Sequence, residues 1–364
     1  MALYRTYRPK TFEEVIGQEH ITKTLQNQIM NGHIGHAYLF TGTRGTGKTS
    51  VAKIFARAVN CLDPQNGSPC GKCANCLKLQ NDNDINVIEM DAASNNKVDD
   101  VREIREKVKF MPVDVKYKVY IIDEVHMLTD SAFNALLKTL EEPPKHIIFI
   151  LATTEVHKLP QTILSRCVRF DFRLVSVKEL MAHLGKIFKR EKIECDEESL
   201  KLIATAGEGS VRDTLSIADS IASYCQGKIT KEETLKILGT TDYLLNVEFF
   251  NCLKEREVGK MLALIDKMEK EGKNLAVFAK DISRHARNLL VVKTCENANE
   301  ILSLPDDAYA LFEEQAKLFD EKDLIRYMQV FSSAENELRY TLSVRLLLET
   351  TCLTAMSGEQ VKKN

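Results

Sequence analysis

The sequence lacks any apolar run long enough to cross a membrane, since such a span needs about 20 mostly apolar residues. Its first residues also lack the apolar stretch of a secretory signal peptide. These two absences argue against a membrane protein and against a secreted one. We therefore expect a cytoplasmic protein with no membrane partner.

The sequence also lacks a large excess of basic or acidic residues. The 364 residues include 50 basic and 52 acidic ones, which gives a formal net charge of −2. A general attraction to nucleic acid is thereby excluded, so any DNA-binding surface must be local or assembled from several subunits. The length predicts two or three domains, and 44% hydrophobic with 28% charged residues is typical of a globular protein.

The ten cysteines are not expected to form disulfides in a reducing compartment. Six are scattered and are interpreted as ordinary buried residues. The other four have the spacing C-x8-C-x2-C-x2-C and are Cys61, Cys70, Cys73 and Cys76. Four thiolates in one short segment predict a structural zinc site without an open coordination position, and an iron–sulfur cluster is the alternative. The expected zinc module, residues 61–84, is interpreted as a rigid docking insertion.

One glycine-rich motif matches the phosphate-binding pattern G-x-x-x-x-G-K-[ST]. It lies between an apolar run at 36–40 and a helical pattern at 50–60, a context that argues against a chance match. Its backbone N–H groups and the following helix N-terminus are expected to hold the phosphates of a nucleoside triphosphate. Lys48 would reach the β- and γ-phosphates and Thr49 would bind Mg²⁺. The motif consists of Gly42, Thr43, Arg44, Gly45, Thr46, Gly47, Lys48 and Thr49.

Apolar runs alternate with helical patterns up to about residue 174. This alternation predicts a parallel α/β sheet that binds its ligand at the carboxyl ends of the strands. The expected strands are 36–40, 85–90, 118–123, 146–152 and 167–170, and the expected helices between them are 50–60, 97–108 and 130–141.

Beyond Ser176 only helical patterns follow. They predict helices at 177–191, 197–206, 211–225, 231–238, 245–254, 258–271, 275–293 and 324–356. The change of pattern divides the chain into a nucleotide domain, a helical lid, a second helical domain and a tail, at residues 1–174, 175–240, 241–358 and 359–364.

An acidic pair, Asp123 and Glu124, ends the third expected strand. Asp123 is expected to complete the Mg²⁺ shell opposite Thr49, and Glu124 to orient and deprotonate the attacking water. Such pairs also occur as surface turns, but the phosphate loop upstream favours the catalytic interpretation.

Three further residues are candidates for contacting the γ-phosphate of a bound nucleotide. Thr153, followed by Thr154, ends the next strand, although threonine is an ordinary residue at such a place. Arg166 precedes the last strand and is either a surface cation or ion-pair partner, or an arginine finger for a neighbouring subunit. Arg212 opens a lid helix and either folds back onto its own nucleotide or pairs with a neighbour such as Asp213.

Together these segments resemble the gamma/tau subunits of the bacterial DNA polymerase III clamp loader, which are AAA+ ATPases. The resemblance is dense to about residue 240 and architectural beyond it. It implies an α/β P-loop AAA+ domain with a four-cysteine zinc insertion, followed by a small helical lid and an all-α collar domain. It rests on the phosphate loop, the four cysteines and residues 7–12, 15–20, 36–40, 91–94, 122–128, 133–144, 151–154, 158–160 and 165–167.

The resemblance also implies roles for single residues. Arg166 would act in trans on a neighbouring subunit and Arg212 in cis as the lid sensor, while Arg8 and Ile16 would flank the adenine. Lys97, at a helix start, is a candidate contact to DNA phosphates that would not depend on base sequence, or else a solvated lysine.

For the whole protein, the resemblance implies a pentameric loader that contains copies of this subunit with delta and delta-prime. ATP binding would open the ring-shaped sliding clamp, beta, at primer–template DNA, and hydrolysis would release the clamp closed around the duplex. The collar would hold the ring of subunits together. Such a subunit belongs to a DNA polymerase holoenzyme without polymerase chemistry of its own. The tau forms continue into helicase- and polymerase-binding domains, which the sequence to Asn364 does not include.

Two other functions fit parts of the pattern. Residues 123–126 spell a DExH box, as in helicases, but no second motor domain follows Ser176. Another AAA+ DNA-remodelling motor is the related alternative. A nucleotide-gated scaffold without turnover would not need Lys48, Asp123 and Glu124 together. The sequence therefore favours an ATPase.

Overall fold

The computed structural model describes residues 2–80, 84–96, 98–225, 227–238, 243–271, 274–302, 306–338, 341 and 343–357. The chain divides into two units, Met1–Lys231 and Glu232–Asn364. No helix in the described ranges combines the length and the apolar character that crossing a membrane requires.

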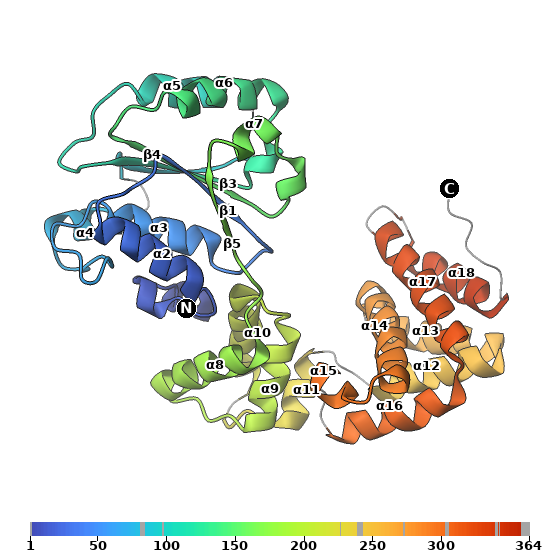
Figure 1. Ribbon diagram of the computed structural model, residues 1–364. Coiled ribbons are helices and arrows are strands. Elements are labelled where there is room, and N and C mark those ends of the chain that lie inside the picture. Colours follow the sequence, from blue (N-terminus) through green and yellow to red (C-terminus); the bar gives the residue numbers. More distant parts are fainter. Residues whose placement is uncertain are drawn as a thin grey trace. The chain divides into compact units, whose positions relative to one another are not determined.

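Five parallel strands form a sheet in the first unit, in the order β2-β3-β4-β1-β5 (Figure 1). Every residue of β1 and β4 is buried, which explains why their sequences are unbroken apolar runs. The strands are β1 (Ala37–Thr41), β2 (Val87–Asp91), β3 (Lys118–Asp123), β4 (Ile147–Thr153) and β5 (Val168–Asp171).

Helices cover both faces of this sheet, with α2 and α3 on one side and α5 and α6 on the other (Figure 1). Side chains of β1 alternate between the two cores: Tyr38 and Phe40 pack in the first, Ala37 and Leu39 in the second. The helices and short helical turns of this layer are α1 (Leu3–Thr6), η1 (Phe12–Glu14), α2 (Glu19–Met30), α3 (Lys48–Ala58), α4 (Ala74–Lys78), α5 (Val98–Lys107), η2 (Val125–Met127), α6 (Asp130–Glu141), η3 (Val156–Lys158) and α7 (Gln161–Leu164).

Three capped helices follow the sheet within the same unit. Ser176, Asp196 and Ser210 each accept a hydrogen bond from the N–H group three residues further on, at 3.3, 2.6 and 3.2 Å. Each side chain thereby satisfies one of the free N–H groups of a helix N-terminus. The helices that they begin are α8 (Val177–Glu191), α9 (Glu197–Ala206) and α10 (Val211–Tyr224).

The second unit contains helices around one hydrophobic core. The single helix predicted at 324–356 is wrong, because α17 and α18 are separate helices. Ser343 caps the second of them by accepting the N–H of Leu346 (3.4 Å), a start signal that the sequence analysis missed. The described helices from the division onward are α11 (Lys231–Leu238), α12 (Tyr243–Glu255), α13 (Val258–Lys270), α14 (Leu275–Thr294), α15 (Ala298–Leu302), α16 (Asp306–Leu318), α17 (Glu321–Glu337) and α18 (Val344–Ser357).

A histidine lies in the middle of the second core. His285 is 2% exposed and lies between the rings of Phe250 and Phe312, with centroid distances of 4.7 and 4.5 Å. Its Nε2 is 2.6 Å from Oε1 of Gln315. Burial lowers the pKa of His285 from its ordinary value of 6.5 to about 4, because the charged imidazolium would lose its hydration.

We therefore expect the second unit to lose stability as the pH falls from about 6.5 towards 4. The unfolded chain takes up the proton first, so unfolding becomes more favourable by up to about 3 kcal/mol. Amide exchange of α14 at several pH values measures this loss. His285→Gln, which keeps a polar partner for Gln315 but does not titrate, should flatten the dependence, and an equally steep dependence in this variant would contradict the assignment.

Candidate functional site

The phosphate loop, residues 42–49, connects β1 to α3 at the carboxyl end of the sheet. Two of its glycines are required by close contacts. At Gly42 (φ +140°) a Cβ would lie 2.5 Å from the carbonyl oxygen of Phe172, and at Gly45 (φ +78°) it would overlap with Oγ of Ser210. The loop therefore lies directly against both the end of the sheet and the start of α10.

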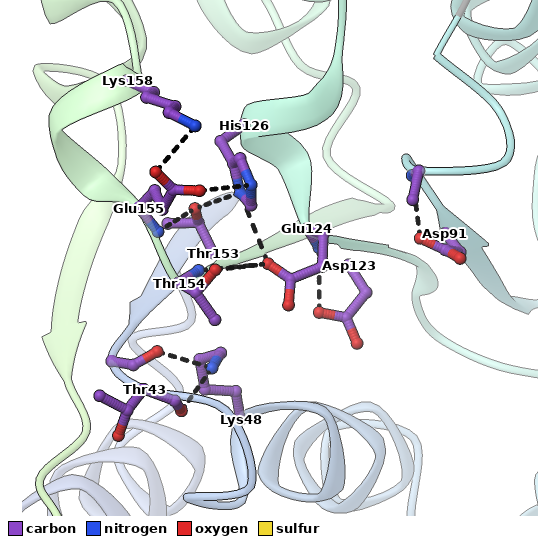
Figure 2. A network of polar contacts seen from close by, with 12 residues as sticks. Thr43, Lys48, Asp91, Asp123, Glu124, His126, Thr153, Thr154, Glu155 and Lys158 are labelled. Carbon is purple, nitrogen blue, oxygen red and sulfur yellow. Dashed lines mark hydrogen bonds and ion pairs between the residues drawn. The ribbon is translucent and has the colours of Figure 1, made fainter. Parts of the chain in front are cut away.

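Lys48 is buried at the first position of α3. Its Nζ donates to the carbonyl oxygens of Gly42 (2.7 Å) and Thr43 (2.8 Å), as Figure 2 shows. Burial lowers the pKa of Lys48, and the carboxylates of Glu124 and Asp123 act in the opposite direction. A cation held under the loop beside a helix N-terminus is a suitable site for phosphate groups.

The hydroxyl of Thr49 donates to Oδ2 of Asp123 (2.6 Å). This contact joins the start of α3 to the end of β3 and brings a hydroxyl and a carboxylate oxygen together. Oxygen ligands of this kind suit Mg²⁺, which is bound through one or two protein groups plus substrate phosphates. The residues present therefore fit a Mg²⁺–nucleotide complex.

Glu124 follows Asp123 with a left-handed backbone (φ +46°) and points towards the end of β4 (Figure 2). Its Oε2 accepts hydrogen bonds from the hydroxyl (3.0 Å) and the N–H (3.3 Å) of Thr154. Thr153 is the residue predicted to sense the γ-phosphate, but it is fully buried and its hydroxyl lies 3.0 Å from Nδ1 of His126. The structure thus brings Thr154, rather than Thr153, against the acidic pair.

A cavity of about 1360 Å³ opens over this edge of the first unit. Most of the residues predicted for the nucleotide site line it, whereas Gly42, Thr43, Thr153 and Arg166 are not among its lining residues. The predicted residues in its wall are Arg8, Ile16, Arg44, Gly45, Thr46, Gly47, Lys48, Thr49, Asp123, Glu124 and Arg212.

The start of α10 contacts the phosphate loop directly. The carbonyl oxygen of Gly45 accepts the N–H groups of Val211 (3.1 Å) and Arg212 (3.4 Å). The Arg212 guanidinium lies over the ring of Tyr4, 5.4 Å from its centroid. Sequence reasoning missed Tyr4, because nothing but an aromatic residue near the N-terminus marks it.

Arg166 lies after α7, outside the cavity lining. Its guanidinium pairs with Glu141 (2.7 Å) and donates to the carbonyl oxygen of Thr162 (2.7 Å). Within the single chain it is thus an ion-pair partner, one of the two roles that the sequence left open. Lys97 falls outside the described residues.

The four cysteines of the expected zinc module form one cluster, with all sulfur atoms within 4.8 Å of one another. The Sγ atoms of Cys61 and Cys73 are 3.9 Å apart, and those of Cys70 and Cys76 are 4.0 Å apart. Four thiolates around a tetrahedral zinc ion lie about 3.8 Å apart, given Zn–S bonds of about 2.3 Å. The donor set therefore fits zinc.

Backbone N–H groups point at these sulfur atoms. Cys61 Sγ accepts the N–H of Cys70 (3.3 Å), and Cys73 Sγ accepts that of Cys76 (3.4 Å). Burial raises the pKa of the Cys73 thiol, but hydrogen bonds from the N–H groups of Leu62 and Cys76 outweigh it and bring the pKa to about 6. A thiolate, the form that binds metal, is thereby favoured at Cys73.

One side of the cysteine cluster is fixed to the end of α3. The amide of Asn60 exchanges two hydrogen bonds with the backbone of Tyr117, donating at 2.9 Å and accepting at 2.7 Å. Asn75, in α4, donates to the carbonyl oxygen of Asn60 (2.8 Å). These contacts hold the cluster against the residues that lead into β3.

The other side contacts the N-terminal segment. Ser68 Oγ lies 2.8 and 2.7 Å from the two carboxylate oxygens of Glu13 and accepts the N–H of Phe12 (3.3 Å). Gly67 (φ +79°) lies so close to α2 that a Cβ would be 2.7 Å from the carbonyl oxygen of Gln26. The module is therefore packed into the nucleotide domain on two sides.

Three protein-family models match successive parts of the chain. They are described as DNA polymerase III, delta subunit (residues 17–176), DNA polymerase III clamp loader subunit, ATPase lid domain (179–227), and DNA polymerase III subunits gamma and tau domain III (229–363).

Curated relatives match along nearly the whole chain. The DNA polymerase III subunit tau of Bacillus subtilis (strain 168) is 44% identical over 348 residues, 96% of this chain and 62% of the relative. The subunit tau of Escherichia coli (strain K12) is 37% identical over 358 residues, 98% of this chain and 55% of the relative. The DNA polymerase III subunit gamma of Buchnera aphidicola subsp. Baizongia pistaciae is 35% identical over 366 residues, 96% of this chain and 95% of the relative. The chain belongs to the DNA polymerase III gamma/tau subunit family.

Membership of the gamma/tau family confirms the resemblance predicted from the sequence. The chain spans 62% and 55% of the two tau subunits but nearly the full length of the Buchnera gamma subunit. The solved structure of the Thermotoga maritima RuvB Holliday junction branch migration motor is similar in fold, with a TM-score of 0.50 at 20% identity over 74% of this chain and 86% of that chain. With the parallel sheet and the matched lid and gamma/tau domains, the predicted P-loop AAA+ architecture is confirmed.

Proposed function

We propose that this member of the gamma/tau family is an ATPase subunit of a bacterial replicative clamp loader, working in the cytoplasm. The observation that carries the proposal is the 2.6 Å hydrogen bond between Thr49 and Asp123 beside Glu124. It joins the phosphate loop to the acidic pair in the wall of one cavity. Both halves of an ATP-hydrolysing site are therefore available in one chain.

In this proposal the N–H groups of residues 42–49 bind the phosphates of ATP, and Lys48 turns from the loop carbonyls to the β- and γ-phosphates. Thr49 and Asp123 hold Mg²⁺, which when bound neutralises phosphate charge. Glu124 orients the attacking water and accepts its proton. Arg8 and Ile16 flank the adenine, and Thr153, at the end of β4, stays a predicted γ-phosphate sensor.

Two arginines, Arg212 and Arg166, stabilise the negative charge on the phosphates during hydrolysis. Arg212 acts in cis, since its backbone already contacts the loop through Gly45. Arg166 acts in trans on the nucleotide of a neighbouring subunit, since it lies outside its own cavity lining. For this role it must exchange Glu141 for phosphate oxygens.

ATP binding would let a pentamer of this subunit with delta and delta-prime open the sliding clamp, beta, at primer–template DNA. Hydrolysis would then release the clamp closed around the duplex. Lys97 is proposed as one contact to the DNA backbone. The names of the family and its lid model support this assignment. The proposed domains are 1–174, a lid at 175–240 and an oligomerising collar at 241–358, with a tail at 359–364.

The four-cysteine cluster is proposed to hold structural Zn²⁺, with Cys61, Cys70, Cys73 and Cys76 as its ligands. All four positions of a tetrahedral ion are then filled by protein, so the ion takes no part in hydrolysis. Its role is to stabilise the module that packs between α3 and the N-terminal segment.

Glu124→Gln should abolish hydrolysis but retain nucleotide binding, because only the proton-accepting carboxylate is lost. The expected decrease in kcat is about a hundredfold or more. Phosphate release by the complete assembly and binding of a fluorescent ATP analogue measure the two effects. Glu106→Gln on α5 is a control for removing an exposed carboxylate. Unchanged hydrolysis in Glu124→Gln would favour another base, and no hydrolysis in the unaltered chain would favour a nucleotide-gated scaffold.

Arg166→Ala should leave ATP binding by the isolated chain unchanged but lower hydrolysis by the assembled loader by about a thousandfold. The isolated chain should be weakly active, and delta, delta-prime, clamp and primed DNA should stimulate it. Arg169→Ala is the matched control, an arginine three residues away that pairs with Asp171 at 2.7 Å. An isolated monomer as active as the assembly would rule out action in trans.

Metal analysis of the purified chain should give one zinc ion per chain. Cys73→Ser should lower the zinc content well below one ion per chain and lower the melting temperature, because metal binding contributes to folding. Cys167→Ser is a control at a half-buried cysteine outside the cluster. Iron together with labile sulfide, in place of zinc, would instead indicate an iron–sulfur cluster.

A further inference from the structure

His126 lies two residues after Glu124, in η2, and its side chain is 7% exposed. Figure 2 shows its ring between Glu124 and the residues that follow β4. Nδ1 lies 3.0 Å from the hydroxyl of Thr153, and Nε2 lies 3.4 Å from Oε1 of Glu155. The ring thus connects the turn after β3 with the turn after β4.

The hydrogen bonds around this ring indicate which of its nitrogen atoms carries the proton. Glu155 donates its backbone N–H to Oγ1 of Thr153 (3.0 Å), which leaves the Thr153 hydroxyl proton for Nδ1 of His126. Nε2 then carries the proton that faces the Glu155 carboxylate. Lys158 lies 2.8 Å from the same carboxylate, and its hydrogen bond lowers the pKa of Glu155, so Glu155 remains an acceptor. Thr153, His126 and Glu155 therefore fix one another's positions.

The position of Glu124 depends on this arrangement. Its Oε2 is held by Thr154, the residue between Thr153 and Glu155, so Glu124 is linked to His126 through the turn after β4. Its left-handed backbone gives Glu124 a conformation that a free chain rarely adopts. A shift of the turn after β4 would therefore move the carboxylate that is proposed to accept the proton of water.

We propose that His126 is a positioning residue for ATP hydrolysis, which holds the ends of β3 and β4 together so that Glu124 keeps its place. The inference rests on the proposed function of Glu124. His126 does not line the cavity, so it acts through Glu124 and Thr153 and not by touching the nucleotide. A displacement of about 1 Å at such a site costs up to about a hundredfold in rate.

The test compares His126→Ala, His126→Asn and the unaltered chain in the complete loader. Alanine should lower kcat about ten- to hundredfold with KM and nucleotide affinity unchanged, because the loss concerns geometry and not binding. Asparagine, whose amide can replace Nδ1 at Thr153, should restore most of the rate. His157→Asn is the control, since His157 also approaches Glu155 (3.6 Å) but its side chain is 74% exposed.

Amide exchange gives a second measurement that does not depend on turnover. The N–H groups of Thr154 and Glu155, which are bound to Glu124 and Thr153, should exchange faster in His126→Ala and regain protection in His126→Asn.

Several outcomes would overturn the inference. One is an unchanged kcat in His126→Ala while Glu124→Gln is inactive. Another is a loss of rate in His126→Ala that is fully explained by a loss of nucleotide affinity. A third is a His126→Asn variant as slow as His126→Ala. Unchanged exchange at Glu155 overturns it whatever the rates. Active Glu124→Gln together with faster exchange would instead overturn the proposed base and leave the positioning contact in place.

Discussion

The position of β4 between β1 and β3 is the constraint on which the site depends. In a parallel sheet all strands end at the same edge, so the segments after three neighbouring strands must converge there. The register pairs Thr41 with Thr153 and Ile122 with Leu151, which places the phosphate loop on one side of the β4 end and the acidic pair on the other. The Thr49–Asp123 bond then closes the gap between them.

Much of the first unit could be predicted because its sequence signals are local. β1 and β4 are covered on both faces, so continuous apolar runs marked them to within one residue. The helices Asp130–Glu141 and Val177–Glu191 have the predicted bounds, since a capping threonine or serine precedes each. The phosphate loop and the cysteine spacing were equally clear, because each is a short motif whose chemistry requires its own residues.

The rest depends on contacts between distant segments, which no local pattern records. Two adjacent threonines end β4, and only the fold decides that Thr154 contacts Glu124 while Thr153 faces His126. Tyr4 meets Arg212 because the N-terminal helix packs on α10. The break between α17 and α18 was missed because a single capping serine, Ser343, is a weak signal within a long helical pattern.

Helix α3 is held at both ends. Its first residues form the phosphate loop contacts. Just after its other end comes Asn60, which is bonded to Tyr117 and to Asn75 of the cysteine module. A single residue added to or removed from an α-helix rotates everything beyond it by about 100° and shifts it by about 1.5 Å. An insertion or deletion within α3 would therefore turn the cysteines away from their contacts. The length of α3 is fixed by this geometry, in addition to the packing of its mostly buried side chains.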